Sequence, residues 1–209
     1  EVTAAVRQAL DDGVAWQTLD LATPAKDAFT EALFDTLPRA FAARARIQFC
    51  SPSGSDAVEA ALKLTKTATG RSGVIAFAGG YHGMTHGALA LMGNRGPKAL
   101  PGLMPGAQFM PYPHPYRCPF GIGGSAGAEV GAAMLRHALA DVESGVLPAA
   151  LLLELVQGEG GVIPAPNAWT DAVRCATKDF GVPMIVDEVQ TGWGRTGRLY
   201  AFEHAAIEP

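Results

Sequence analysis

Short apolar runs alternate with stretches of helical periodicity along most of the chain. The runs are bounded by glycine, serine, proline or carboxylate residues, which is typical of strands buried in a sheet. We predict strands at residues 47–50, 74–77, 149–156 and 182–186. We predict helices at residues 28–37, after Ser55 with Val58, Ala61, Leu62 and Thr65 on one face, after Gly83, at 131–142 and at 171–180.

This order of elements predicts the fold class. Alternation of strands and helices is typical of an α/β fold, in which helices cover both faces of a mostly parallel sheet. Residues 1–46 carry helical patterns and are expected to lead into one large domain over residues 47–209. Residues 93–127 are rich in glycine and proline and are predicted to form a long functional loop. Because ligands of such folds bind beyond the carboxyl ends of the strands, the residues that follow each strand are the candidates for chemistry.

Composition and charge narrow the class of protein. Hydrophobic residues make up 48% of the chain and charged residues 17%, which favours a well-packed core. The formal net charge of −4 is scattered without a basic patch, so nucleic acid is not expected as a partner. No apolar run is long enough to span a bilayer. Cys50, Cys118 and Cys175 are far apart and lack zinc-ligand spacing, which favours a reducing, cytoplasmic setting.

The first candidate site is Ser53-Gly54-Ser55-Asp56, where a strand is expected to give way to a helix. Unpaired backbone N–H groups and the helix dipole favour an anion at a helix N-terminus. Gly54 allows close approach of the backbone and Ser55 adds a hydroxyl, so this junction is a candidate phosphate site. An ordinary N-cap is the alternative, because Ser53 and Asp56 have capping-box spacing.

The second candidate is Gly79-Gly80-Tyr81-His82-Gly83, after the predicted strand 74–77. An aromatic ring between glycines can stack on a flat heteroaromatic ligand, although Tyr81 could instead pack on the core. His82 and His86 lie one helical turn apart, but neither a zincin glutamate nor a third ligand accompanies them. We therefore expect no metal.

Two carboxylates, Glu154 and Glu159, follow the predicted strand 149–156 within a glycine-rich turn. Carboxylates that leave a buried strand need partners or an exposed site. They are candidates for substrate binding, and a pair of structural salt bridges is the alternative.

The most informative segment is Val182 to Gly192, in which Asp187 follows a hydrophobic strand. A poorly solvated carboxylate needs a cation, and a protonated pyridine nitrogen is one; the carboxylate would keep the ring an electron sink. Gln190 would then reach the phenolic oxygen of that ring. A metal-binding or structural Asp-Glu pair is the alternative. The glycine pattern at 192–197 matches a dinucleotide fingerprint, but it does not directly follow the strand and no βαβ unit follows it.

These four segments, in this order, resemble the class III (ornithine/GABA-type) aminotransferases, which are pyridoxal-phosphate enzymes of fold type I. The resemblance implies that Gly54 and Ser55 bind the phosphate of pyridoxal 5′-phosphate and that Tyr81 stacks on its ring with His82 beside it. It also implies that Asp187 pairs with the ring nitrogen and Gln190 with the phenolic oxygen. Glu159 resembles the carboxylate that gates the substrate pocket, and Glu154 supports the site.

Residues 15–24 and 113–121 look like the diaminobutyrate–2-oxoglutarate aminotransferases, which implies 2,4-diaminobutyrate, aspartate semialdehyde, glutamate and 2-oxoglutarate as substrates. The resemblance also implies a homodimer. No lysine here matches the family's Schiff-base lysine, so we expect that residue, and the C-terminal domain, to lie beyond Pro209. An inactive fragment is therefore expected. The alternatives are another class III aminotransferase, for ornithine, acetylornithine or GABA, and a non-catalytic domain that binds phosphate ligands or another subunit.

Overall fold

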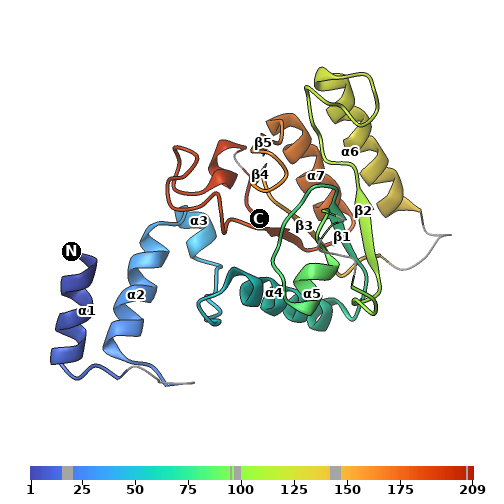
Figure 1. The fold of residues 1–209 in the computed structure, drawn as a ribbon. Coiled ribbons are helices and arrows are strands. Elements are labelled where there is room, and N and C mark those ends of the chain that lie inside the picture. Colours follow the sequence, from blue (N-terminus) through green and yellow to red (C-terminus); the bar gives the residue numbers. More distant parts are fainter. Residues whose placement is uncertain (16–20, 95, 97–99, 142–146, 206) are drawn as a thin grey trace. The chain divides into compact units, whose positions relative to one another are not determined.

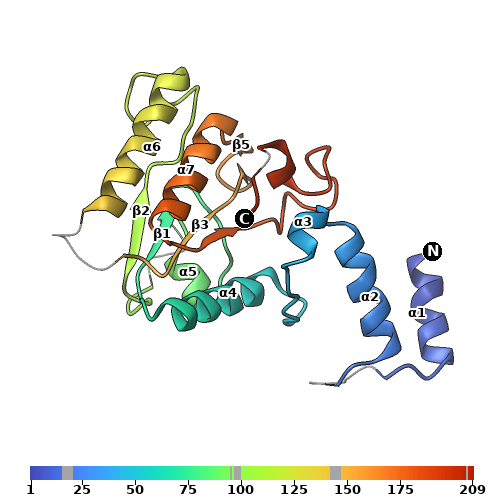
Figure 2. The ribbon, with the colours of Figure 1, turned by 180° about the vertical axis from the view of Figure 1, so that it is seen from behind.

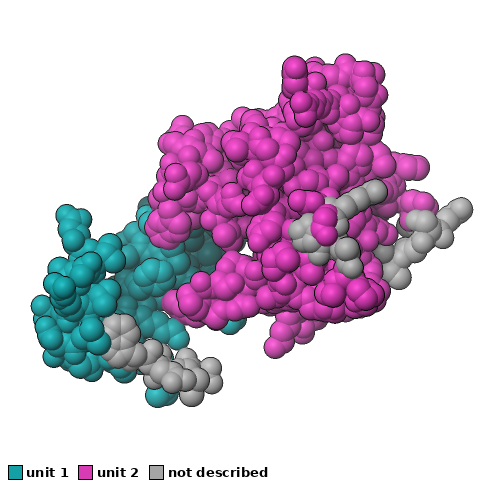
Figure 3. Space-filling model, viewed as in Figure 1, with its two compact units in different colours: residues 1–48 teal, residues 49–209 magenta. Residues whose placement is uncertain are grey.

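The computed structural model describes residues 1–15, 21–94, 96, 100–141, 147–205 and 207–209. It divides into two compact units, residues 1–48 and residues 49–209, which are coloured separately in Figure 3. Parts of three segments used in the sequence analysis fall outside the described residues: 16–20 within 15–24, 95 and 97–99 within 93–127, and Val142 at the end of 131–142.

The described residues of the first unit form three helices, α1 (Val2–Asp11), α2 (Pro24–Asp35) and α3 (Arg39–Ala42), none of which has a fully buried residue. Helix α2 begins four residues before the predicted 28–37 because its start is capped. The Thr23 side chain accepts a hydrogen bond from the Lys26 N–H at 3.2 Å, and Pro24 occupies the first turn, where no N–H is needed.

The second unit is built on a four-stranded parallel sheet, in the order β2-β1-β3-β6 (Figure 1). The strands are β1 (Val74–Phe77), β2 (Ala107–Met110), β3 (Ala150–Leu153) and β6 (Met184–Val186). Helices α4 (Gly54–Thr69) and α5 (His86–Ala90) cover one face, and α6 (Gly124–Ala140) and α7 (Asn167–Asp179) cover the other (Figures 1 and 2). A small antiparallel pair, β4 (Val156–Gln157) and β5 (Ile163–Pro164), and a 3₁₀ helix, η1 (Ala201–His204), complete it. The predicted α/β fold with a mostly parallel sheet is confirmed.

The core lies on both faces of the sheet, which explains why the strand sequences are continuously apolar. On the first face, Val74 and Ala76 of β1 pack in a cluster with Val58 and Leu62 of α4. On the second face, the Phe77 ring meets the Trp169 ring of α7 edge to face at 5.2 Å. No helix formed by the described residues is long and apolar enough to cross a membrane.

Three predicted elements need correction. Residues 47–50 are not a strand, and they join neither of the two described sheets. Their apolar residues have a high propensity for strands, but a strand also needs a neighbouring strand with which to form hydrogen bonds. Strand β2 lies inside the predicted loop 93–127, and helix α6 begins within the last four residues of that predicted loop. The predicted strand 149–156 ends at Leu153 and is interrupted at Glu154, whose carboxylate binds backbone N–H groups of two loops.

Candidate functional site

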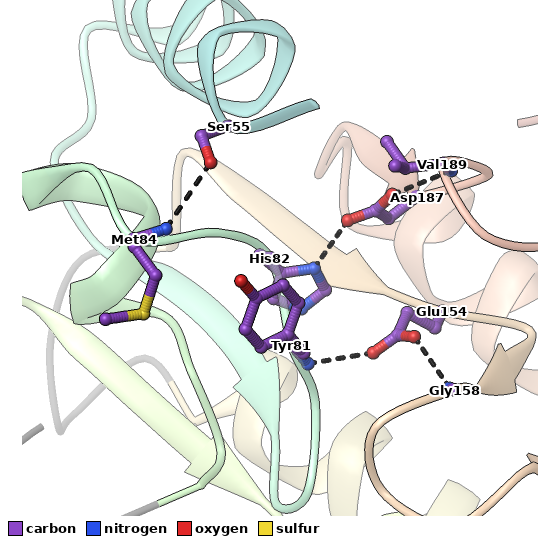
Figure 4. Close-up of polar contacts among 8 residues, drawn as sticks. All are labelled: Ser55, Tyr81, His82, Met84, Glu154, Gly158, Asp187 and Val189. Atoms are coloured by element: carbon purple, nitrogen blue, oxygen red, sulfur yellow. Dashed lines mark hydrogen bonds and ion pairs between the residues drawn. The ribbon is translucent and has the colours of Figure 1, made fainter. Parts of the chain in front are cut away.

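The carboxyl ends of β1, β3 and β6 open onto one pocket, with a volume of about 220 Å³. Leu153 of β3 is the register partner of Val186 of β6, so Glu154 and Asp187 leave the sheet side by side. The N-terminus of α4 and the loop after β1 close the pocket. Its lining residues are Gly54, Ser55, Tyr81, His82, Gly83, Glu154, Asp187, Val189 and Gln190. Seven of the eight residues singled out from the sequence are thus brought together, and Figure 4 shows five of them.

Asp187 and His82 form a buried pair at the centre of the pocket. The two residues are 9% and 4% exposed, and His82 Nδ1 lies 2.8 Å from Asp187 Oδ2 (Figure 4). An ionised carboxylate only accepts hydrogen bonds, so Nδ1 carries the hydrogen when Asp187 is charged. Asp187 Oδ1 accepts a second bond, from the Val189 N–H at 3.0 Å. Each oxygen can accept more than one bond, so the carboxylate keeps acceptor capacity for a ligand.

Glu154 is buried beside this pair and is held by backbone N–H groups. Tyr81 N–H donates to Oε1 at 2.9 Å and Gly158 N–H donates to Oε2 at 3.0 Å (Figure 4). Burial raises the pKa of Glu154, and the nearby Asp187 adds to the rise, although the two N–H groups and His82 act against it. Both oxygens of Glu154 accept hydrogen bonds from main-chain N–H groups. Glu154 is therefore held by the backbone and not by a structural salt bridge, which was the alternative prediction for this residue.

The N-terminus of α4 forms the wall opposite Glu154. The Ser53 side chain makes no capping hydrogen bond, and the Asp56 carboxylate instead accepts a hydrogen bond from the Ser51 hydroxyl. The capping-box interpretation is therefore wrong. A Cβ atom at Gly54 would lie 2.9 Å from both γ-methyl groups of Val189, which explains glycine there. Ser55 Oγ accepts from the Met84 N–H at 3.4 Å. The wall therefore brings the first N–H groups of a 16-residue helix to the pocket.

Tyr81, Gln190 and Glu159 differ in how far they reach the pocket. Tyr81 is half-buried in the lining, and Gln190 is exposed at the rim, against the Gly158 backbone. Glu159 is exposed and is not among the lining residues. The proposed stacking, hydrogen-bonding and gating roles of these three residues stay predictions.

Val189 and Gly83 also line the pocket, although the sequence analysis gave neither of them a role within its candidate segment. Val189 lies inside the segment Val182 to Gly192, so its position beside Asp187 and Gln190 could have indicated that it lines the pocket. Gly83 has φ +121°, and a side chain there would collide with Ser55. Only the packing of the loop against α4 reveals that requirement.

The carboxylate that follows Asp187 has a structural task. Glu188 Oε2 accepts from the Ala201 N–H at 3.0 Å and Oε1 accepts from the Phe202 N–H at 3.0 Å, so this side chain holds the start of η1. Asp187 and Glu188 therefore face different surroundings and do not act as a metal-binding pair. The glycine pattern 192–197 forms turns that lead to η1 and opens no long helix, as a dinucleotide site would need.

The described residues contain no group of three histidine, cysteine or acidic side chains that could hold a metal ion. His82 is turned toward Asp187, whereas His86 Nε2 lies 3.0 Å from the Gly102 carbonyl oxygen. Larger hollows of about 340 and 540 Å³ lie beside η1 and beside β2. Neither is lined by a carboxylate, whereas Glu154 and Asp187 both line the smaller pocket.

In open α/β sheets, ligands bind beyond the carboxyl ends of the strands, and a helix N-terminus at that edge favours a phosphate group. The family profile described as "Aminotransferase class-III" matches residues 1–209, so the chain belongs to the class III aminotransferases. The family resemblance drawn from the four segments is confirmed.

Individual relatives agree with this family. The chain is 57% identical over 211 residues to a "Diaminobutyrate--2-oxoglutarate aminotransferase" of Rhizobium meliloti, covering 100% of this chain and 45% of that protein. It is also 57% identical over 207 residues to the protein of that name from Haemophilus influenzae, covering 98% and 45%. The chain therefore spans a little under half the length of the curated relatives it matches.

Solved structures show the same architecture. An amine transaminase from an uncultivated Pseudomonas species, in a PLP-bound form, superposes with a TM-score of 0.88 at 31% identity, covering 100% of this chain and 48% of that one. The taurine:2-oxoglutarate aminotransferase of Bifidobacterium kashiwanohense, in complex with PLP and glutamate, gives 0.86 at 28% identity, covering 100% and 46%.

Proposed function

We propose that the whole protein is a pyridoxal-phosphate-dependent transaminase. It would transfer an amino group between two pairs of compounds, 2,4-diaminobutyrate with aspartate semialdehyde and glutamate with 2-oxoglutarate. The observation that carries the proposal is the convergence of Asp187, Tyr81 and the α4 N-terminus in one pocket. The 57% identity to two proteins named for this reaction supports the substrate pair.

The residues of the pocket fit the cofactor. The N–H groups at the start of α4, with the Ser55 hydroxyl, suit a phosphate dianion. Asp187 keeps acceptor capacity for a protonated ring nitrogen, and Tyr81 offers a ring face for stacking. Gln190 is placed at the rim, where its amide would reach the phenolic oxygen.

The chain's own side chains would bind and orient the cofactor. When bound, pyridoxal phosphate supplies the electron sink that the reaction needs. Asp187 would hold the ring nitrogen protonated, and His82 would hold Asp187 in place through the contact at 2.8 Å. Glu154 would fix the backbone of Tyr81 and so the stacking ring. None of the lysines among the described residues lines the pocket, so the covalent and proton-transfer steps are assigned to no residue here.

We further propose a homodimer in the cytoplasm. Trp193 and Val189 are 66% and 65% exposed, an apolar exposure that suits a subunit contact. Cys118 and Cys175 form no disulfide, as suits a reducing compartment. Analytical ultracentrifugation of the protein expressed from the complete reading frame tests the dimer, and a monomer would exclude it.

The function is tested by absorbance spectra of the same protein with pyridoxal phosphate, before and after 2,4-diaminobutyrate is added. We expect the bound cofactor to convert to pyridoxamine phosphate, and to do so faster than with ornithine or GABA. A response only to another amine would exclude the substrate but keep the transaminase. Failure to bind the cofactor would favour a non-catalytic domain.

A further inference from the structure

Glu59 lies outside the pocket, on α4 one turn after Ser55, yet its carboxylate holds the element that follows the pocket loop. Its Oε1 accepts from the Thr85 hydroxyl at 2.7 Å, from the Gly87 N–H at 2.7 Å and from the Ala88 N–H at 3.1 Å. One oxygen of a side chain on α4 thus caps the start of α5. A Cβ atom at Gly87 would collide with this carboxylate, so Gly87 leaves the space that Glu59 fills.

The carboxylate is charged under ordinary conditions. Burial acts to raise the pKa of Glu59, but the bonds from the Thr85 hydroxyl and from the Ala88 and Gly87 N–H groups outweigh it, and His86 acts in the same direction. The net pKa is lowered. Bonds to an ionised acceptor are the stronger kind of hydrogen bond.

These bonds join the two walls of the pocket. Helix α4 carries Gly54 and Ser55 at its N-terminus, and the loop that leads into α5 carries Tyr81. A second hydrogen bond between these walls that the described residues show, from Met84 N–H to Ser55 Oγ, is 3.4 Å long and therefore weak. Glu59 is the stronger tie between them.

We propose that Glu59 is a positioning residue that sets the spacing between the phosphate-binding start of α4 and the stacking ring of Tyr81. This role rests on the proposed function. A short linker joins the ring and the phosphate of pyridoxal phosphate, so the molecule makes both contacts together only when the two walls lie within the reach of that linker. Inorganic phosphate contacts the α4 wall alone, so its binding does not depend on that distance.

The test compares Glu59→Ala, Glu59→Gln and a control, Glu129→Ala, which removes an exposed carboxylate on α6. Each is made in the protein expressed from the complete reading frame. The dissociation constant of pyridoxal phosphate is measured by absorbance titration, and that of inorganic phosphate by competition. We expect Glu59→Ala to weaken pyridoxal phosphate about tenfold, the loss of a charge-assisted hydrogen bond, and to leave phosphate nearly unchanged.

The glutamine variant separates positioning from loss of charge. All three bonds fall on one oxygen, and glutamine keeps one carbonyl oxygen, so Glu59→Gln should recover most of the cofactor affinity. Equal weakening of both ligands by Glu59→Ala, no weakening at all, or a glutamine variant as poor as alanine would each overturn the spacing role. A wild-type protein that does not bind pyridoxal phosphate would instead overturn the proposed function, and the role of Glu59 with it.

Discussion

His82 Nδ1 and Asp187 Oδ2 lie 2.8 Å apart inside the protein, although 105 residues separate them along the chain. One follows β1 and the other follows β6, and β3 lies between those strands. The contact joins the ring-stacking loop to the carboxylate that the proposed function assigns to the ring nitrogen. Both side chains are largely buried, at 4% and 9% exposed.

His82→Ala should therefore weaken cofactor binding and lower the free energy of unfolding. It leaves a buried carboxylate oxygen without its donor, which costs about 1–3 kcal/mol. His82→Asn retains a donor near the position of Nδ1, so it should lower the free energy of unfolding and the cofactor affinity less than His82→Ala does. Urea unfolding and cofactor titration measure both effects, with the exposed His137→Ala as control. Equal stability of the alanine variant and wild type would show that the pair contributes nothing.

Glu154→Gln should be more damaging than the conservative exchange suggests. Each Glu154 oxygen accepts one backbone N–H, and an amide would turn its own NH₂ group toward one of those donors. The unfolding free energy should fall by about 1–3 kcal/mol. Glu159→Gln, on the exposed turn, should leave it almost unchanged, and a comparable loss in both variants would contradict the argument.

The two carboxylates beside the pocket should affect stability with opposite pH dependence. The raised pKa of Glu154 means that its contribution is largest at low pH and falls as pH rises above the unfolded value of 4.5, through the folded pKa. The lowered pKa of Glu59 means that its contribution is present above 4.5 and is lost as pH falls through the folded pKa.

Urea unfolding over a pH series can separate these two effects. The stability difference between wild type and Glu154→Gln should shrink as pH rises above 4.5, whereas the difference between wild type and Glu59→Gln should shrink as pH falls below it. His82 and Asp187 face Glu154, and His86 faces Glu59, so each of these groups is kept unchanged in the comparison. Differences that vary in the same direction would refute the assignment.

Gly54→Ala should weaken cofactor binding while leaving the fold intact. Alanine favours the helix, but its Cβ atom would lie 2.9 Å from both Val189 methyl groups, and Val189 would have to move at the pocket wall. Combining Gly54→Ala with Val189→Ala removes the collision. Cofactor titration of both single variants and the double variant measures the coupling, and strictly additive effects would show that the collision is irrelevant.

Much of the fold followed from local pattern. The runs at 74–77 and 182–186 predicted β1 and β6 because strands covered by helices on both faces have no polar side to interrupt them. The run at 47–50 misled because four residues with strand propensity do not specify a neighbouring strand. Strand β2 was missed because Gln108 and the surrounding glycines and prolines obscure its short apolar pattern.

The sequence by itself determined the class of fold, the family, and which residues are candidates, because strand ends and their glycine-rich loops are local features. Only the tertiary structure decided what each candidate does. It turned Asp187 into the pocket and Glu188 toward η1, although the two are adjacent in the chain. It also excluded Glu159 from the lining and showed that Glu59 joins the two walls. A side chain's partners depend on which distant segments pack against it, and spacing along the chain carries no information about that packing.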